Sequence, residues 1–256
     1  MSRSALPKRP PEDFDWILLQ FNKKKLTPTI VAGQAVNIWG KAFREWDAKF
    51  NPYSPKIDDL LPLSSDDLEI LETTDVKAIS KFKGVRFVDK AKPSSRVRSA
   101  DAATLWFENE KGRLKVQVMS WVIGADNEEI ERRSIPVRLG DSQVEVKVPD
   151  PIVLLKCKIA NLVRLNQDDP PRQDLKHIKI LICCVHAFIG HFVQSESDPR
   201  PALKLINRLR RLARTHYAKQ VGEKYHLDWD RCIPMEVIRQ LAKDSPKWER
   251  FLRQKP

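Results

Sequence analysis

The hydrophobic period of the chain changes near residue 150, and this change constrains the fold more than any other feature. Before it, short apolar runs are separated by turn signals such as Gly84, Lys111-Gly112 and Gly140-Asp141. After it, apolar residues recur every three or four positions, which is typical of helices with one buried face. The helices predicted after the change are Pro151–Leu165, Gln173–Val193, Pro201–Gln220, Pro234–Lys243 and Pro246–Arg253. The sequence therefore predicts an α+β protein with a helical second half.

The first half has the pattern of a small mixed sheet accompanied by helices. The predicted strands are Thr29–Val31, Leu68–Leu71, Val85–Val88, Ala103–Glu108, Leu114–Ile123, Ile135–Leu139 and Val144–Val148, of which the last four form two hairpins. The predicted helices are Asp13–Phe21, an amphipathic helix from Ala35 to Phe50, and a helix that begins near Thr74 and stops at Gly84. We divide the chain into an N-terminal extension (residues 1–22), an α/β domain (23–150) and a helical domain (151–256).

The chain is strongly basic, which favours a polyanionic partner. Its 256 residues contain 46 Lys and Arg against 34 Asp and Glu, giving a formal net charge of +12. Each phosphate that a basic protein neutralises releases counterions, so nucleic acid or nucleotide is the expected partner. The alternative is a solvated cationic surface without a partner.

The cysteines and the most apolar segment indicate a buried core in a reducing compartment. Cys157, Cys183, Cys184 and Cys232 show neither a CxxC pair nor a zinc-ligand spacing, and we expect buried free thiols in a cytoplasmic protein. The segment Ile178–Val193 is short for a bilayer span and contains His186 and His191, so we predict a core helix and no membrane association. The basic N-terminus lacks the apolar run of a signal peptide.

Two carboxylates two residues apart, Asp67 and Glu69, flank Leu68 on a predicted strand. Alternate side chains of a strand share a face, so the two carboxylates would project together while Leu68 enters the core. A divalent cation would relieve their repulsion, and Mg²⁺ with substrate phosphates needs few carboxylates. The plain alternative is a half-exposed strand. Gly33, between a predicted strand and helix, could let a phosphate approach the helix N-terminus, or could simply form a tight turn.

The predicted helix after Pro201 places basic residues opposite apolar ones. Its basic residues are Lys204, Arg208, Arg211 and Arg214, with Arg210 and Lys219 nearby. A basic stripe of this kind is typical of contacts with a phosphate backbone, although surface helices are often basic without a partner.

Four motifs in this order resemble one family of enzymes. They are Gly33-Gln34-Ala35, Ser65-Asp66-Asp67-Leu68-Glu69, the segment Pro151–Lys158 (PIVLLKCK), and Arg172-Gln173-Asp174. Between about Thr29 and Leu181 the chain resembles the AbiEii-type abortive-infection toxins of the polymerase-β-like nucleotidyltransferase superfamily. The resemblance implies a minimal nucleotidyltransferase fold followed by a helical domain. Gln34 departs from the small residue usual in the first motif, and Gln173 replaces a lysine in the last.

The resemblance also implies a site, a cofactor and partners. Asp67 and Glu69 would ligate Mg²⁺ bound to a nucleoside triphosphate, and Lys158 and Asp174 would join them as catalytic residues. Gly33, Gln34, Ser65 and Arg172 would contact the nucleotide. The acceptor would be a hydroxyl, plausibly on tRNA or another RNA held by the basic stripe, and a cognate antitoxin is a possible partner. Without the resemblance, Lys158 would be read as a snorkelling helix lysine and Asp174 as a helix-start carboxylate.

The main departure concerns a third carboxylate, which many members of the superfamily carry on a neighbouring strand. Its counterpart here is Gln117 in Lys115–Met119, and an amide brings no charge and cannot act as a base. Two further readings therefore stay open. The chain could be a degenerate nucleotidyltransferase that only binds nucleic acid, or an unrelated α/β protein in which the motifs coincide.

Overall fold

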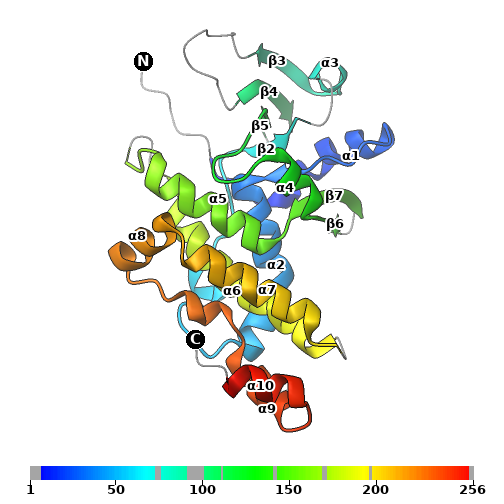
Figure 1. Cartoon of the computed structure of the whole chain (residues 1–256). Helices are drawn as coiled ribbons and strands as arrows, with labels where there is room; N and C mark the ends of the chain where they lie inside the picture. Colours follow the sequence, from blue (N-terminus) through cyan, green and yellow to red (C-terminus); the bar gives the residue numbers. More distant parts are fainter. Residues whose placement is uncertain are drawn as a thin grey trace. The chain divides into compact units, whose positions relative to one another are not determined.

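The computed structural model describes residues 7–72, 76–90, 101–110, 112–140, 143–168, 172–195 and 198–253 (Figure 1). The chain forms two compact units, each made of two segments. The first unit consists of Met1–Ile38 and Pro62–Lys158, and the second of Trp39–Leu61 and Ile159–Pro256.

The first unit contains the mixed sheet that the sequence predicts. Its strands, in spatial order, are β1 (Ile30–Val31), β2 (Leu68–Leu71), β5 (Gly112–Met119), β4 (Asp101–Asn109) and β3 (Val85–Lys90). The β2–β5 pair is parallel and the other pairs are antiparallel. Burial alternates along β5, where Leu114, Val116 and Val118 enter the core. This alternation leaves the residues between them on the opposite face of the sheet.

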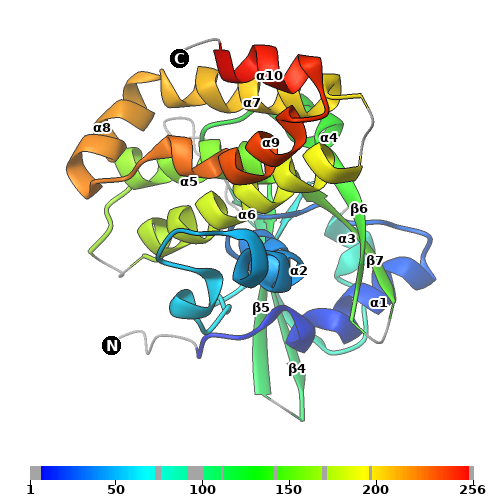
Figure 2. The same ribbon diagram turned by 90° about the horizontal axis from the view of Figure 1, so that it is seen from below.

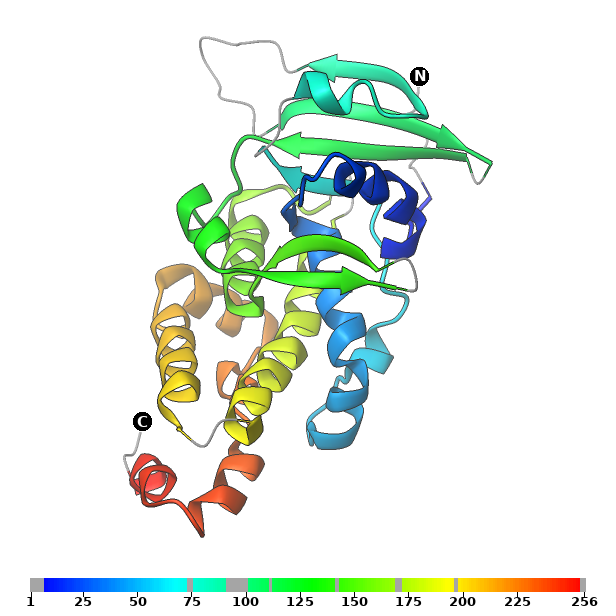
Figure 3. The same ribbon diagram turned by 90° about the vertical axis from the view of Figure 1, so that its right-hand side faces the viewer.

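The second predicted hairpin forms a sheet of its own in the same unit, from β6 (Ser134–Leu139) and β7 (Val144–Pro149). The 3₁₀ turn η1 (Pro11–Phe14) leads into α1 (Asp15–Lys23), which lies between this hairpin and the larger sheet (Figure 3). Trp16 packs edge-on against Phe107 of β4, with ring centroids 5.8 Å apart. On its other side, Asn22 exchanges two 2.8 Å hydrogen bonds with the backbone of Glu145 in β7. Helix α1 therefore joins the two sheets.

Two short helices complete the first unit, α3 (Val76–Ile79) and α4 (Asn127–Arg132). The start that the sequence predicts at Thr74 lies outside the described residues. Helix α4 is not predicted from the sequence, because six residues are too few to establish a helical period. Asp126 caps it by accepting a 2.6 Å hydrogen bond from the Glu129 amide, and Ile130 brings it into the core.

The corner between β1 and α2 (Ala32–Phe50) differs from the prediction of a glycine turn. The residue with positive φ is Ala32, at 54°, and Gly33 already lies in the first turn of the helix. A side chain in this left-handed region is strained, so the corner must be held by its surroundings.

The second unit is helical and is organised around α6 (Asp174–Ser195) (Figure 2). Its other elements are the later part of α2, η2 (Ile57–Leu60), the end of α5 (Pro151–Arg164), α7 (Arg200–Ala213), α8 (His216–Tyr225), η3 (Trp229–Cys232), α9 (Met235–Ala242) and α10 (Pro246–Arg253). Helix α6 contacts η2, η3, α7 and α9. The single helix predicted over 201–220 is wrong, because Thr215 accepts from the Ala218 amide and starts α8 separately.

Helix α6 is the described helix that is long and apolar enough, by length and composition, to cross a membrane, but 67% of its apolar window is buried inside the protein. The core helices of globular proteins pass the same test. The four cysteines are free and buried, as predicted, whereas His191 is exposed and does not belong to the core.

A buried carboxylate fixes the connector that follows α2. Asp47 is 1% exposed and accepts hydrogen bonds from the Asn51 side chain at 2.6 Å and from the Ile57 amide at 2.8 Å. Ala42 of the same amphipathic helix is exposed although it is apolar, whereas the charged Asp47 is buried. Asp47 lies on the buried side because it satisfies backbone and amide donors there.

Gly190 of α6 permits the close approach of the Trp46 ring, since a Cβ at this position would overlap ring carbons. We expect Gly190→Ala to lower the free energy of unfolding by about 1–3 kcal/mol through overpacking, despite the better helix propensity of alanine. Urea unfolding followed by circular dichroism measures this loss. Gln194→Ala, at an exposed position of the same helix, should change stability by less than about 0.5 kcal/mol. Equal stability of the two variants would contradict the packing argument.

His186 of α6 should make the second unit sensitive to acid. Its side chain is fully buried beside Trp46, and among the described residues neither ring nitrogen has a hydrogen-bond partner. Burial lowers the pKa of His186 from 6.5 to about 4. Between pH 6.5 and pH 4 the unfolded chain therefore binds a proton at His186 more readily than the folded protein does. The free energy of unfolding falls as the pH drops through this range.

The predicted loss between pH 7.5 and pH 5 is about 2 kcal/mol for the wild type. His186→Phe should remove this part of the pH dependence, as measured by urea unfolding at both pH values. His191→Phe, an exposed position on the same helix, should leave it in place. A wild-type slope retained in His186→Phe would exclude His186 as its source.

Candidate functional site

The pairing of β2 with β5 determines which side chains share the outer face of the mixed sheet. Leu68 lies opposite Val116, and Glu69 lies opposite Gln117. The register thus places Gln117 directly beside Glu69 on the neighbouring strand, and its equivalence to a third carboxylate stays a prediction. Asp67 immediately precedes β2, and the same register continued by one residue sets it opposite Lys115.

A continuous polar network connects three strands on this face. The Lys115 ammonium donates to Asp67 Oδ2 at 3.0 Å and to Gln117 Oε1 at 2.9 Å. The other end of the Gln117 amide donates to Asp101 Oδ2 of β4 at 2.9 Å. We call Asp67, Glu69, Lys115, Gln117 and Asp101 the carboxylate face.

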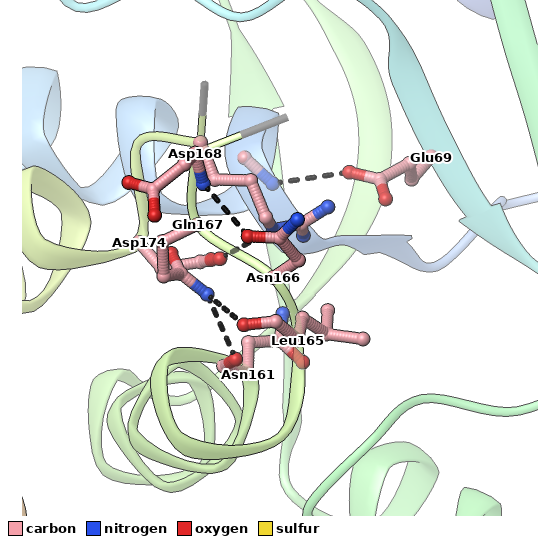
Figure 4. Close-up of polar contacts among 9 residues, drawn as sticks. Glu69, Asn161, Leu165, Asn166, Gln167, Asp168 and Asp174 are labelled. Carbon is pink, nitrogen blue, oxygen red and sulfur yellow. Dashed lines mark hydrogen bonds and ion pairs between the residues drawn. The ribbon is translucent and has the colours of Figure 1, made fainter. Parts of the chain in front are cut away.

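Glu69 connects the carboxylate face to helix α2. Its carboxylate accepts a hydrogen bond from the Gly33 backbone amide at 3.3 Å, the bond that ends on Glu69 in Figure 4. This amide belongs to the first turn of α2, where unsatisfied N–H groups and the helix dipole favour negative charge. The structure therefore places the Gly33 amide beside Glu69, and contact of Gly33 with a nucleotide stays a prediction.

Negative charge accumulates where the chain enters β2. The pKa of Asp66 is raised by partial burial and then by the adjacent Asp67, while Lys8 and Lys115 act in the opposite direction. An acid whose pKa is raised by a neighbouring carboxylate shows that the two charges repel. A cation placed between such groups is stabilised by both.

Ser65 and Gln34, predicted as nucleotide contacts, hold the segment around Arg9. Ser65 and Arg9 exchange backbone hydrogen bonds of 2.7 and 3.0 Å. The Gln34 side chain is fully buried, donates to the Arg9 carbonyl at 2.9 Å and accepts from Asn37 at 3.1 Å. The Gln34 amide is thus used within the fold, and contact of either residue with a nucleotide stays a prediction.

Lys158 lies on α5 and is only 4% exposed. A snorkelling lysine would carry its ammonium to the surface, so this alternative does not describe Lys158. The neighbouring Cys157 is also buried, which raises the pKa of its thiol to about 12 even though Lys158 and Lys156 act to lower it. The thiol of Cys157 is therefore protonated and unreactive.

Arg172 and Asp174 belong to the second unit and pair with each other. Arg172 Nε lies 2.7 Å from Asp174 Oδ2, and Asp174 is buried in the first turn of α6, where the helix dipole stabilises its charge. Gln167, which Figure 4 shows with its neighbours, donates to the carbonyls of Asn161 and Leu165 at the end of α5. The structure thus shows Arg172 and Asp174 as parts of the connection between α5 and α6. The catalytic role of Asp174 and the contact of Arg172 with a nucleotide stay predictions.

The basic stripe is present on α7. Lys204 and Arg211 are exposed, Arg208 is half-buried, and exposed Arg214 caps the helix. The buried face of α7 consists of Ala202, Leu205, Ile206, Leu209 and Leu212. Arg210 lies off the stripe, with its guanidinium 5.2 Å from the centre of the Phe251 ring, and Lys219 belongs to the separate helix α8.

Sequence reasoning missed two members of the carboxylate face, Lys115 and Asp101. The signal for Lys115 was its alternation with Gln117 on one strand, which puts both side chains on one face. Asp101 could not be found in this way, because a bulge between Asp101 and Ala103 shifts its register against β5. Among the described residues, no group of three or more His, Cys, Asp or Glu side chains could hold a metal ion.

Comparison with known proteins gives one structural likeness. No protein family matches the sequence, and no curated protein does. A nucleotidyltransferase-like antigenic protein from Paracoccidioides brasiliensis aligns over 76% of this chain and 92% of its own, with 13% identity and a TM-score of 0.38. A likeness this distant carries no argument about the site, which rests on the geometry given above.

Proposed function

We propose that this protein is a nucleotidyltransferase that moves a nucleoside monophosphate from a nucleoside triphosphate to an acceptor hydroxyl. The observation that carries the proposal is the register of β2 on β5. It sets Asp67 and Glu69 on one face, beside the N-terminal turn of α2. Paired carboxylates next to a helix N-terminus suit a bound cation with its phosphates.

The proposed cofactor is Mg²⁺, and the donor set fits it in number and chemistry. Mg²⁺ retains several waters and commonly takes one or two carboxylates together with substrate phosphates. Asp67 and Glu69 would supply those carboxylates. When bound, the ion would neutralise charge on the triphosphate and on the departing pyrophosphate.

The remaining residues of the face would position the nucleotide. The acceptor hydroxyl would lose its proton to solvent as its oxygen bonds to the α-phosphorus, while the bond from that phosphorus to the bridging oxygen breaks and pyrophosphate leaves. Lys115 would attract phosphate oxygens, and the first turn of α2 would present its amides and its dipole. Most of the acceleration would come from orientation and neutralisation of charge.

The acceptor that we propose is RNA, tRNA among the possibilities, in the manner of an AbiEii-type toxin with an antitoxin partner. The net charge of +12 and the stripe on α7 support a polyanionic acceptor. Four buried free thiols suit the reducing cytoplasm.

Calorimetric titration with each nucleoside triphosphate tests the site directly. We expect binding by the wild type only with Mg²⁺, and a loss of at least about tenfold in affinity for Asp67→Asn and Glu69→Gln, because each removes a negatively charged ligand. Glu108→Gln is the matched control, since Glu108 lies on the same sheet and pairs with Arg86. Binding that is indifferent to Mg²⁺ and to both substitutions would exclude the proposed site.

A second candidate is a nucleic-acid-binding module without catalysis. The specific observation in its favour is that Gln117, the counterpart of the third carboxylate in the resemblance, is a neutral amide that accepts a hydrogen bond from the Lys115 ammonium. RNA binding by such a module would survive EDTA and weaken steeply with salt.

Charge reversal on the stripe tests the RNA surface that both candidates share. In the triple variant Lys204→Glu, Arg208→Glu and Arg211→Glu, we expect RNA affinity to fall by at least about tenfold. The slope of log affinity against log salt concentration should also become less steep, by an amount that corresponds to about two lost phosphate contacts. Fluorescence anisotropy at several salt concentrations measures both quantities.

The matched control for this variant reverses the exposed Lys23, Lys24 and Lys25 at the end of α1, which changes the net charge equally. Equal losses in the two triple variants would mean that net charge alone determines binding and that α7 is not the RNA surface.

A further inference from the structure

The Lys115 ammonium lies against Asp67, one of the two proposed metal ligands. It is 3.0 Å from Asp67 Oδ2 and 2.9 Å from Gln117 Oε1, so it is held by an acceptor just before β2 and by one on β5. The side chains of Asp67 and Lys115 are only 15% and 24% exposed. Solvent screens such a pair less than one on the open surface, and the attraction is correspondingly stronger.

The hydrogen bonds of Gln117 determine where the ammonium sits. A carboxylate can only accept, so Asp101 must face the NH₂ end of the Gln117 amide. The carbonyl end therefore points to Lys115, where it accepts the second hydrogen bond. Asp101 thus acts on Lys115 through Gln117, as a positioning residue.

A divalent cation and this ammonium compete for Asp67. Two cations on one carboxylate would lie a few ångströms apart and repel, so each weakens the binding of the other. Displacement of Lys115 costs it two acceptors, which makes binding of a metal alone less favourable. A triphosphate that arrives with the metal brings phosphate oxygens, which would give Lys115 new acceptors.

We propose that Lys115 is an internal counter-ion of the carboxylate face that weakens the binding of a divalent cation until a nucleotide provides the ammonium with phosphate oxygens. The inference rests on the proposed function for the identity of the nucleotide. The competition between Lys115 and the metal depends only on the contacts described above.

The test is titration of the whole protein with Mn²⁺, followed by the electron paramagnetic resonance of the free ion, in the absence of nucleotide. Lys115→Met should bind Mn²⁺ about tenfold or more tightly than the wild type, and Asp67→Asn added to it should abolish this gain. Lys156→Met is the matched control, because Lys156 pairs with Glu129 in the same unit and should leave Mn²⁺ affinity unchanged. Lys115→Gln is made in parallel, and thermal melting identifies which variant is folded.

A second titration includes a nucleoside triphosphate. Addition of the nucleotide should raise the Mn²⁺ affinity of the wild type more than that of Lys115→Met. Only the wild type has an ammonium that can move from Asp67 to the phosphate oxygens. Equal Mn²⁺ affinity of the wild type and the folded Lys115 variants without nucleotide would overturn the inference. Nucleotide-dependent binding through Asp67 would then still uphold the proposed function. Tighter Mn²⁺ binding by Lys115→Met, with no nucleotide bound by any variant, would uphold the inference and reject the function.

Discussion

The parallel pairing of β2 with β5 is the constraint on which the candidate site depends. It joins segments that are 48 residues apart in the chain, as the Lys115–Asp67 bond shows. Because strand side chains alternate, a slip of one residue would turn Leu68 and Ile70 outward and bury Asp67 and Glu69. The apolar residues on both strands exclude that slip, since they have the core on one side only. The hydrophobic core thus sets the geometry of the polar face.

Charge on that face is partly compensated by the protein itself. Asp67, Glu69 and Asp101 bring three carboxylates to neighbouring strands, and Lys115 and the Gly33 amide compensate two of them directly. A fourth carboxylate at position 117 would add repulsion and would leave Lys115 and Asp101 without the neutral bridge between them. The Gln117 carbonyl accepts from Lys115, and its NH₂ group donates to Asp101. An amide is suited to this position because it can both accept and donate.

The sequence predicted the parts of this molecule that depend on local period. The strands and hairpins of the mixed sheet follow from alternation. The resemblance placed Gln117 on a strand next to the carboxylate pair, and Gln117 does lie opposite Glu69. Features that depend on contacts distant in sequence were not predictable. The positive φ of Ala32, the burial of Asp47 under its connector and the bond from Asp101 to Gln117 require knowledge of the neighbouring elements. The helix break at Thr215 was missed for a local reason, because the apolar period continues across the cap.

Gln117 alone favours a site that has lost its chemistry, but its surroundings change that interpretation. Without metal, the Asp67 and Glu69 carboxylates repel each other, and the Lys115 ammonium beside Asp67 reduces that repulsion. The Gln117 carbonyl helps to hold the ammonium there. A triphosphate would compete with Asp67 for the ammonium more strongly than neutral water does, because its oxygens are negatively charged. Under the proposed function, the amide at position 117 is therefore compatible with a site that couples a cation to a nucleotide, and the pair Lys115–Gln117 is the feature that separates this interpretation from simple loss of function.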